Sequence, residues 1–352
     1  MHILIAERLK PFSHSLKNSV IIPGTHLFIE VYPAFILVHS LSKDKPELVS
    51  KIEINLEGPV SKFTVQLNLE KGYLLVFGDS ASGYFRYRLS FSLDEKKLFI
   101  AVEKEGKKTL VFKQIFGTFL LHMGQNPDEF LSPERLSLGN HKQQDFELIK
   151  RRQDLKEILP IWLKTGGFYK EVPVFLDEGT GSLLKEIEKA IEKSDTNHLS
   201  DLFKTLFNSS FEGMMVPSLT DLTHQGLKLP PVKSLASPLF LLSYGAKLIR
   251  SLFVRFKKNK LELLPALPKE FHSGRFLHAV LENAGMLDLE WSKKTMRRMI
   301  LFANKTFALE LKLPKEIKRF RLKSNGTSEW IKTGTCLKIE KDNHYFFDRF
   351  EK

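Results

Sequence analysis

The hydrophobic period changes twice along the chain, and this order restricts the fold more than any other feature. Residues 1–117 contain short runs in which apolar and polar side chains alternate, most strictly over residues 85–91. Such alternation is typical of a strand with one buried face. Residues 118–259 show helical spacing, and residues 260–352 return to strand patterns. The sequence therefore predicts an α+β fold in three parts, with boundaries near these positions.

The two outer parts are expected to be β-sandwiches. In the N-terminal part, seven or so short strands with tight turns predict an antiparallel sandwich. Its stretch 27–41 contains Pro33, so we expect two strands or one bulged edge strand there. The C-terminal part predicts a smaller sandwich, with a strong turn at Asn325-Gly326. Its candidate strands are 296–302, 307–313, 317–323, 329–332, 336–340 and 344–348.

The middle part is predicted to be a short helical segment. Residues 117–139 are typical of a connecting segment. Asn140 and Gln143 then form a capping-box pattern before a helix over 142–159, which Pro160 is expected to end or kink. Further helices are expected over 182–193, 197–208 and 239–256, with a Gly- and Pro-rich loop before the last one.

The charge balance is strongly basic. The 352 residues include 54 Lys and Arg against 41 Asp and Glu, a formal charge of +13. This excess could serve an acidic protein partner. The basic residues are spread along the chain and form no RNA-binding signature, so a lysine-rich solvated surface is the simpler interpretation and nucleic acid is not expected.

The single cysteine, Cys336, excludes an internal disulfide and a Cys-rich zinc site. The N-terminal residues lack the basic and apolar regions of a signal peptide. No apolar run approaches the roughly 20 residues that span a bilayer, so no transmembrane segment is expected. These features predict a cytoplasmic protein without a cofactor, although export by an unconventional signal is left open.

Four features between about Ser237 and Asn325 occur in a characteristic order. A helix-like run precedes Leu-Leu-Pro-Ala-Leu-Pro at 263–268; there follow an aromatic residue and a glycine, an Ala-Gly-Met-Leu-Asp-Leu-Glu-Trp segment at 284–291, and an Asn-Gly turn. The aromatic and small residues are Phe271, Ser273 and Gly274. This order resembles the end of glycoside hydrolase family 95, the inverting α-L-fucosidases and their relatives. The resemblance covers roughly a quarter of the chain.

The resemblance implies a helical catalytic barrel that leads into a small sandwich, and the matched residues are structural in that family. Their chemistry agrees: Pro265 and Pro268 are expected to stiffen an extended linker strand, Gly274 and Gly285 to permit turns, and Trp291 to fill the sandwich core.

Inverting hydrolysis needs two carboxyl groups about 6.5–9.5 Å apart. Ala236 stands near the position of the family carboxylate before the last barrel helix, and no Asp or Glu lies between Asp221 and Glu262. A barrel of about twelve helices also needs on the order of 200 residues, against about 140 here. The missing carboxylate predicts that hydrolysis has been lost, and the length predicts a reduced barrel.

Three polar residues of the loop after the third predicted helix are the remaining catalytic candidates. Glu212, Asp221 and His224 could supply acid–base chemistry, or could simply cap the loop. His141 and Asp145 have the spacing of a metal pair, but no third ligand is evident, so no metal site is predicted. The Gly-rich residues 177–181 lack the Lys of a phosphate loop and are expected to form a turn before the second helix.

The sequence thus predicts a non-catalytic or degenerate glycoside-hydrolase-like protein with a carbohydrate-binding or scaffold role. An active glycosidase with a relocated pair, Glu212 and Asp221, is the enzymatic alternative. A basic protein that holds acidic partners is the third.

Overall fold

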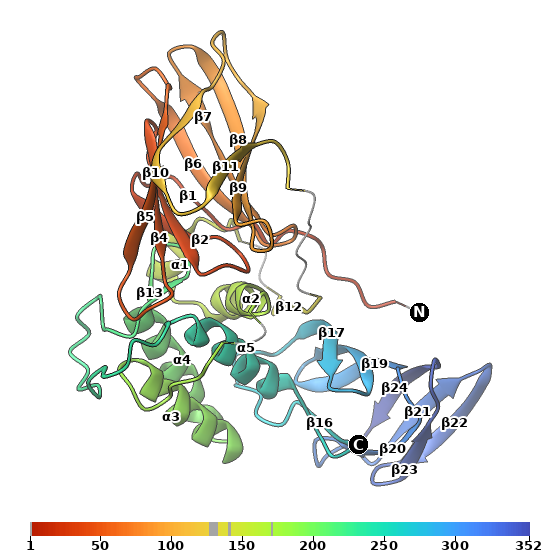
Figure 1. The fold of residues 1–352 in the computed structure, drawn as a ribbon. Coiled ribbons are helices and arrows are strands. Elements are labelled where there is room, and N and C mark those ends of the chain that lie inside the picture. Colours follow the sequence, from red (N-terminus) through yellow and green to blue (C-terminus); the bar gives the residue numbers. More distant parts are fainter. Residues whose placement is uncertain (1, 127–132, 140–141, 170–171) are drawn as a thin grey trace.

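The computed structural model describes residues 2–126, 133–139, 142–169 and 172–352. The fold is α+β, as predicted: an antiparallel β-sandwich, a short helical segment and a second β-sandwich follow one another along the chain. Figure 1 shows the N-terminal sandwich at the top, the helices in the middle and the C-terminal sandwich at lower right. The first residues run along the helical segment before they enter the upper sandwich (Figure 1).

The N-terminal sandwich consists of a six-stranded and a five-stranded sheet. The six-stranded sheet has the order β1 (Phe12–Ser13), β6 (Ser61–Asn68), β7 (Tyr73–Ser80), β8 (Gly83–Ser92), β9 (Lys97–Lys104) and β11 (Leu120–Met123). The five-stranded sheet has the order β10 (Phe112–Gly117), β5 (Glu47–Ile54), β4 (Phe35–Ser40), β3 (Leu27–Val31) and β2 (Asn18–Ile21). All neighbours are antiparallel except β9 and β11.

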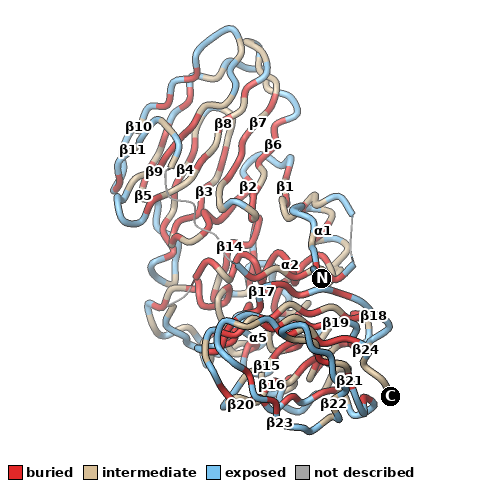
Figure 2. Tube along the Cα trace, turned by 90° about the vertical axis from the view of Figure 1, so that its right-hand side faces the viewer, coloured by how far each residue is buried: buried red, intermediate tan, exposed pale blue. Residues whose placement is uncertain are grey.

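Alternating side chains of both sheets fill the space between them. Val38 on β4 and Leu89 on β8 are completely buried, and buried residues line the inside of the sandwich in Figure 2. The predicted alternation in β8 is confirmed, since Phe85, Tyr87 and Leu89 face the core. The expected pair of strands around Pro33 is also confirmed, because β3 ends at Val31 and β4 begins at Phe35.

The helical segment contains α1 (Phe146–Arg152), α2 (Leu155–Gly166), α3 (Gly181–Glu192), α4 (Thr196–Ser210) and α5 (Phe240–Phe253). Helices α2 and α5 pack closely because two glycines lie at their contact. A Cβ on Gly166 would lie 2.2 Å from the Leu242 carbonyl oxygen, and one on Gly245 would lie 2.5 Å from the Trp162 ring. The buried Trp162 indole also donates to the Leu241 carbonyl at 3.1 Å.

The predicted helix over 142–159 is wrong in detail, because the chain forms two helices there. Gln153 adopts a left-handed conformation and ends α1, and the Asp154 side chain accepts from the Lys156 amide to begin α2. Asp145 caps α1, whereas Asn140 of the expected capping box lies outside the described residues. Pro160 lies inside α2, where burial of the following Trp162 and Leu163 offsets its missing hydrogen bond.

The C-terminal sandwich packs a seven-stranded sheet on a four-stranded one. The larger has the order β12 (Arg135–Ser137), β17 (Gly274–Leu281), β18 (Gly285–Ser292), β19 (Thr295–Ala303), β24 (His344–Glu351), β21 (Arg319–Ser324) and β22 (Thr327–Lys332). The smaller has the order β15 (Val254–Lys257), β16 (Lys260–Leu263), β20 (Phe307–Lys312) and β23 (Cys336–Ile339). A further hairpin, β13 (Phe211–Glu212) and β14 (Val216–Pro217), lies between α4 and α5.

The expected connecting segment 117–139 contains two short strands that join different sheets. β11 continues the N-terminal sheet, and β12 lies on the edge of the C-terminal sheet. Glu134, which is 3% exposed, fixes this crossing. Its carboxylate accepts from Arg250 of α5 at 2.7 Å and from the Val280 amide of β17 at 2.9 Å. One buried carboxylate therefore connects the segment before β12, the last helix and the C-terminal sheet.

The 263–268 motif does not form an extended strand, contrary to expectation. β16 ends at Leu263, and Leu264 turns the chain with a φ of 52° while its amide donates to Phe253 at 2.7 Å. Trp291 is a core residue, as predicted, and its ring stacks on Phe253 at 5.2 Å. Gly274 lies in a strand rather than a turn, and a glycine is needed there because a Cβ would meet the Trp291 ring at 2.2 Å.

In the part of the chain that the structure describes, each helix is too short or too polar to cross a bilayer.

Candidate functional site

A cleft of about 830 Å³ lies between the five-stranded sheet of the N-terminal sandwich and the segment after α4. Its charged lining residues are four carboxylates and one ammonium group, and we call it the acidic cleft. The carboxylates are Glu30, Asp44, Glu212 and Asp221, and the ammonium group is Lys45. Apolar side chains from the loop complete the wall, among them Val216, Leu219, Leu227, Leu229 and Val232.

The floor of the cleft is the outer face of β2, β3 and β4. Register places Ser19 opposite Glu30, and Phe28 opposite His39. The intervening residues, such as Ile29 and Val38, point into the sandwich core. Because side chains alternate along a strand, the side chains of these two register pairs must face away from that core and toward the helical segment.

His39 is the most distinctive residue of the floor. Its ring stacks on Phe28 with centroids 4.8 Å apart and an interplanar angle of 7°. Burial lowers the pKa of the His39 imidazole below its usual 6.5, against an opposing effect of the Glu30 charge. The ring is therefore neutral near pH 7, with one nitrogen donating and one accepting. Its buried Nε2 has no hydrogen-bond partner among the described residues.

The β13–β14 hairpin brings Glu212 to the cleft. Met214 donates to the Ser19 carbonyl at 2.7 Å, so the hairpin is attached to the edge of β2. Gly213 allows this approach: its φ is 51°, and a Cβ there would lie 2.0 Å from the Ser19 carbonyl oxygen. Glycine is the residue that tolerates both conditions without strain.

The Gly-rich residues 177–181 form the predicted turn before α3, and they also hold the loop that carries Asp221. Gly179 donates to Pro230 at 2.9 Å, and Thr180 donates through its amide to Leu219 at 3.0 Å. The completely buried Thr180 hydroxyl donates to the Ser218 carbonyl at 2.7 Å. These bonds fix the loop on both sides of Asp221.

Asp221 presents an unsatisfied acceptor to the cleft. Its Oδ1 is buried and accepts no hydrogen bond from any described residue. A buried carboxylate oxygen without a donor costs roughly 1–3 kcal/mol or more, which a bound donor would recover. The cleft thus contains two buried polar atoms, on Asp221 and His39, that have no hydrogen-bond partner within the described part of the chain.

The structure brings two of the three predicted residues together. Glu212 and Asp221 line the acidic cleft, whereas the exposed His224 does not. Glu30, His39 and Asp44 also line the cleft and were not predicted from the sequence. Glu30 and His39 interrupt the apolar stretch 27–41 at positions that face away from the core. Their alternation was a usable signal, but nothing in the sequence indicated that the loop would cover that face.

The predicted absence of a metal site is not tested at His141, which lies outside the described residues. Its expected partner Asp145 caps α1 through its side chain, with the Glu147 amide at 3.0 Å. Across residues 2–126, 133–139, 142–169 and 172–352, no three His, Cys, Asp or Glu side chains are grouped so as to hold a metal ion.

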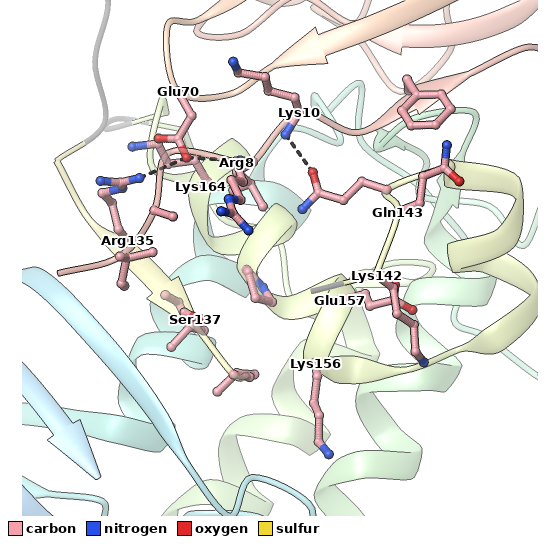
Figure 3. Close-up of a pocket in the computed structure, with 18 of the residues that line it drawn as sticks. Arg8, Lys10, Glu70, Arg135, Ser137, Lys142, Gln143, Lys156, Glu157 and Lys164 are labelled. Carbon is pink, nitrogen blue, oxygen red and sulfur yellow. Dashed lines mark hydrogen bonds and ion pairs between the residues drawn. The ribbon is translucent and has the colours of Figure 1, made fainter. Parts of the chain in front are cut away.

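A second cavity, of about 310 Å³, has the opposite charge (Figure 3). It lies where the N-terminal residues pass β12 and α2, and we call it the basic cavity. Six cationic and two anionic side chains line it. They are Arg8, Lys10, Arg135, Lys142, Lys156, Lys164, Glu70 and Glu157.

The carboxylates of the basic cavity are engaged by neighbouring donors. Glu70 accepts from Arg135 at 3.1 Å and from the Leu9 amide at 3.1 Å. Glu157 is held by the Arg152 guanidinium through two bonds of 2.7 and 2.6 Å. In contrast to Asp221 of the acidic cleft, both carboxylates here accept hydrogen bonds from within the protein.

No protein-family model matches the chain. A comparison with curated proteins gives no significant match. The resemblance to glycoside hydrolase family 95 therefore stays a prediction from the motifs.

Proposed function

We propose that the protein binds a neutral glycan in the acidic cleft and is a reduced, non-hydrolytic relative of family 95-type glycoside hydrolases. The observation that carries the proposal is the pair of unpaired buried atoms, Asp221 Oδ1 and His39 Nε2, on one cleft. A single cysteine, Cys336, agrees with a reducing cytoplasmic location for such a protein.

The chemistry of the lining favours a sugar. Carboxylates only accept hydrogen bonds, whereas a sugar hydroxyl donates and accepts, so hydroxyls can satisfy Asp221 and Glu30 directly. The neutral His39 ring can receive or supply a further bond. Leucine and valine side chains on the opposite wall suit the apolar faces of a sugar ring. Four carboxylates near one ammonium group would repel an anionic ligand.

Hydrolysis is the second candidate, and one observation favours it: Glu212 and Asp221 line the same cleft. An inverting mechanism would need one of them as acid and the other as base, on opposite sides of the scissile bond. Against this, the family position before the last helix is occupied by the buried Ala236. We therefore place binding first.

A thermal-shift screen against neutral glycans, followed by calorimetric titration of the best ligand, tests the proposal. A ligand that binds only the native state raises its melting temperature by mass action. Asp221→Asn should weaken binding at least ~10-fold, because a charge-assisted hydrogen bond contributes roughly 1.5–3 kcal/mol. Asp201→Asn, which changes an exposed carboxylate on α4 outside the cleft, is the matched control and should bind normally.

The same ligands distinguish the alternatives. Release of reducing sugar that is abolished in both Glu212→Gln and Asp221→Asn would establish the hydrolase and overturn the binding role. Absence of any glycan binding, with tight and strongly salt-dependent binding of an acidic protein instead, would support the basic interaction protein.

A further inference from the structure

We propose that the basic cavity is a binding site for a small phosphate-bearing molecule. This site is separate from the acidic cleft and does not depend on the proposed glycan function. The two cavities share no lining residue.

Three cations from distant parts of the sequence converge in this cavity. Arg8 comes from the N-terminal residues, Arg135 from β12, and Lys164 from α2. Figure 3 shows these three side chains gathered around Glu70, whereas Lys156 extends away from them. The N-terminal residues are held in place, because the Lys10 amide donates to the Gln144 side chain at 2.7 Å and Leu9 donates to Glu70.

Cationic side chains outnumber carboxylates six to two among the described residues that line the cavity. In Figure 3 the Glu70 carboxylate lies among the three cations, and it accepts from Arg135 and from the Leu9 amide. Glu7 lies 3.9 Å from Arg135, but its side chain is 73% exposed. Lys164 is only 4% exposed, and burial lowers the pKa of its ammonium group against the opposing charges of Glu70, Glu7 and Glu134. A buried cation is stabilised by a nearby counter-charge, which a bound anion would increase.

The geometry favours a multivalent anion over a simple carboxylate. Three cations can share the charge of a phosphate group, and the two guanidinium groups match its oxygens as paired donors. Ser137 and Gln143 add neutral hydrogen-bonding groups to the lining. A volume of about 310 Å³ is sufficient for a phosphorylated monosaccharide. A compact cavity of this size differs from the extended basic stripe that nucleic acid requires.

Calorimetric titration of the full chain with inorganic phosphate and with glucose 6-phosphate tests the site. Glucose and sulfate serve as reference ligands for the sugar and for a dianion. Lys164→Met and Arg8→Gln should each weaken phosphate binding by at least ~10-fold. Lys156→Met, on the same helix but directed away from the cluster, should change it less than about 2-fold. Arg8 is exposed, so its variant keeps the test valid even if the buried Lys164→Met fails to fold.

The outcomes are distinct. Tighter binding of glucose 6-phosphate than of inorganic phosphate supports the proposal and identifies a phosphorylated sugar, whereas equal binding supports it and identifies phosphate itself. Sulfate that binds as tightly as phosphate with the same loss in Arg8→Gln would overturn phosphate selectivity. No binding at millimolar concentration, an equal loss in Lys156→Met, or binding only of an RNA oligonucleotide would overturn the site.

Discussion

The acidic cleft and the basic cavity both lie where the N-terminal sandwich meets the helical segment. They differ in whether their buried polar groups have partners within the protein. In the basic cavity, Glu70 and Glu157 are held by arginine side chains. In the acidic cleft, Asp221 and His39 keep buried atoms without a partner among the described residues. A carboxylate with a fixed partner belongs to the architecture, whereas one without a partner is available to a ligand.

The two sites also differ in the segments that form them. The acidic cleft depends on a covering segment attached through Gly213 and Thr180, whereas the basic cavity is formed by a helix, a strand and the N-terminal residues. Changes in the covering segment should therefore affect one site and leave the other unchanged.

The largest effect is expected from Gly213→Val, which should disrupt the acidic cleft and leave the basic cavity intact. The new side chain would collide with the Ser19 carbonyl in a left-handed conformation, so we expect a loss of about 4 kcal/mol in unfolding free energy. Urea denaturation measures the loss, and glycan binding should disappear while phosphate binding stays within about 2-fold.

The control for that variant is Gly226→Ala. Gly226 has a φ of 75°, but a Cβ added there would have no atom of the described chain within 4 Å. It should cost about 1 kcal/mol, from backbone conformation alone. An equal loss in both variants would contradict the role assigned to the Ser19 contact.

The next effect tests whether the carboxylates of the basic cavity are structural. Glu157→Gln should lower the unfolding free energy by about 2–3 kcal/mol, because it leaves the partly buried Arg152 without its bidentate partner. Chemical denaturation measures it, with the exposed Glu186→Gln as control. A change below about 0.5 kcal/mol in Glu157→Gln would remove the distinction between the two sites.

A smaller effect concerns pH and His39. The folded pKa of His39 lies below 6.5, so the unfolded chain binds the proton first as pH falls. Stability is therefore lost as pH falls from about 6.5 toward the folded pKa, with a slope of at most ~1.4 kcal/mol per pH unit. The melting temperature of the wild type should fall more between pH 7 and 5.5 than that of His39→Phe. An equal fall in the melting temperatures of the wild type and His39→Phe over this range would contradict the assignment of the pH effect to His39.

The smallest expected effect is a gain in the stability of the unliganded protein. Asp221→Asn removes one of four clustered charges from the cleft, so the unliganded protein should become more stable by about 0.5 kcal/mol. Thermal unfolding without ligand measures it, next to Asp201→Asn. A clear loss of stability would show that Asp221 is structural after all.

The sequence predicted the fold well because the fold follows from local patterns. Alternation in β8 and the break at Pro33 are visible in short windows, and each corresponds to an observed strand or strand end. The division of the 142–159 helix was missed, since it depends on the left-handed Gln153, a residue with no strong preference for that conformation. The strands β11 and β12 were missed because they are too short to show a period.

The acidic cleft could be predicted only in part. Glu212 and Asp221 were found because polar residues in a Gly- and Pro-rich loop are conspicuous. Their companions Glu30 and His39 come from strands more than 170 residues earlier, and only register and loop docking bring them together. The basic cavity was not predicted at all, since Arg8, Arg135 and Lys164 do not stand out in a lysine-rich chain.

We propose that two separate sites of opposite charge bind different ligands, and a crossed titration tests this most directly. The neutral glycan from the screen and glucose 6-phosphate are each titrated into the wild type, Asp221→Asn and Arg8→Gln. We predict that Asp221→Asn weakens only glycan binding and that Arg8→Gln weakens only phosphate binding, each by at least ~10-fold. Equal weakening of both ligands by either variant would contradict the claim.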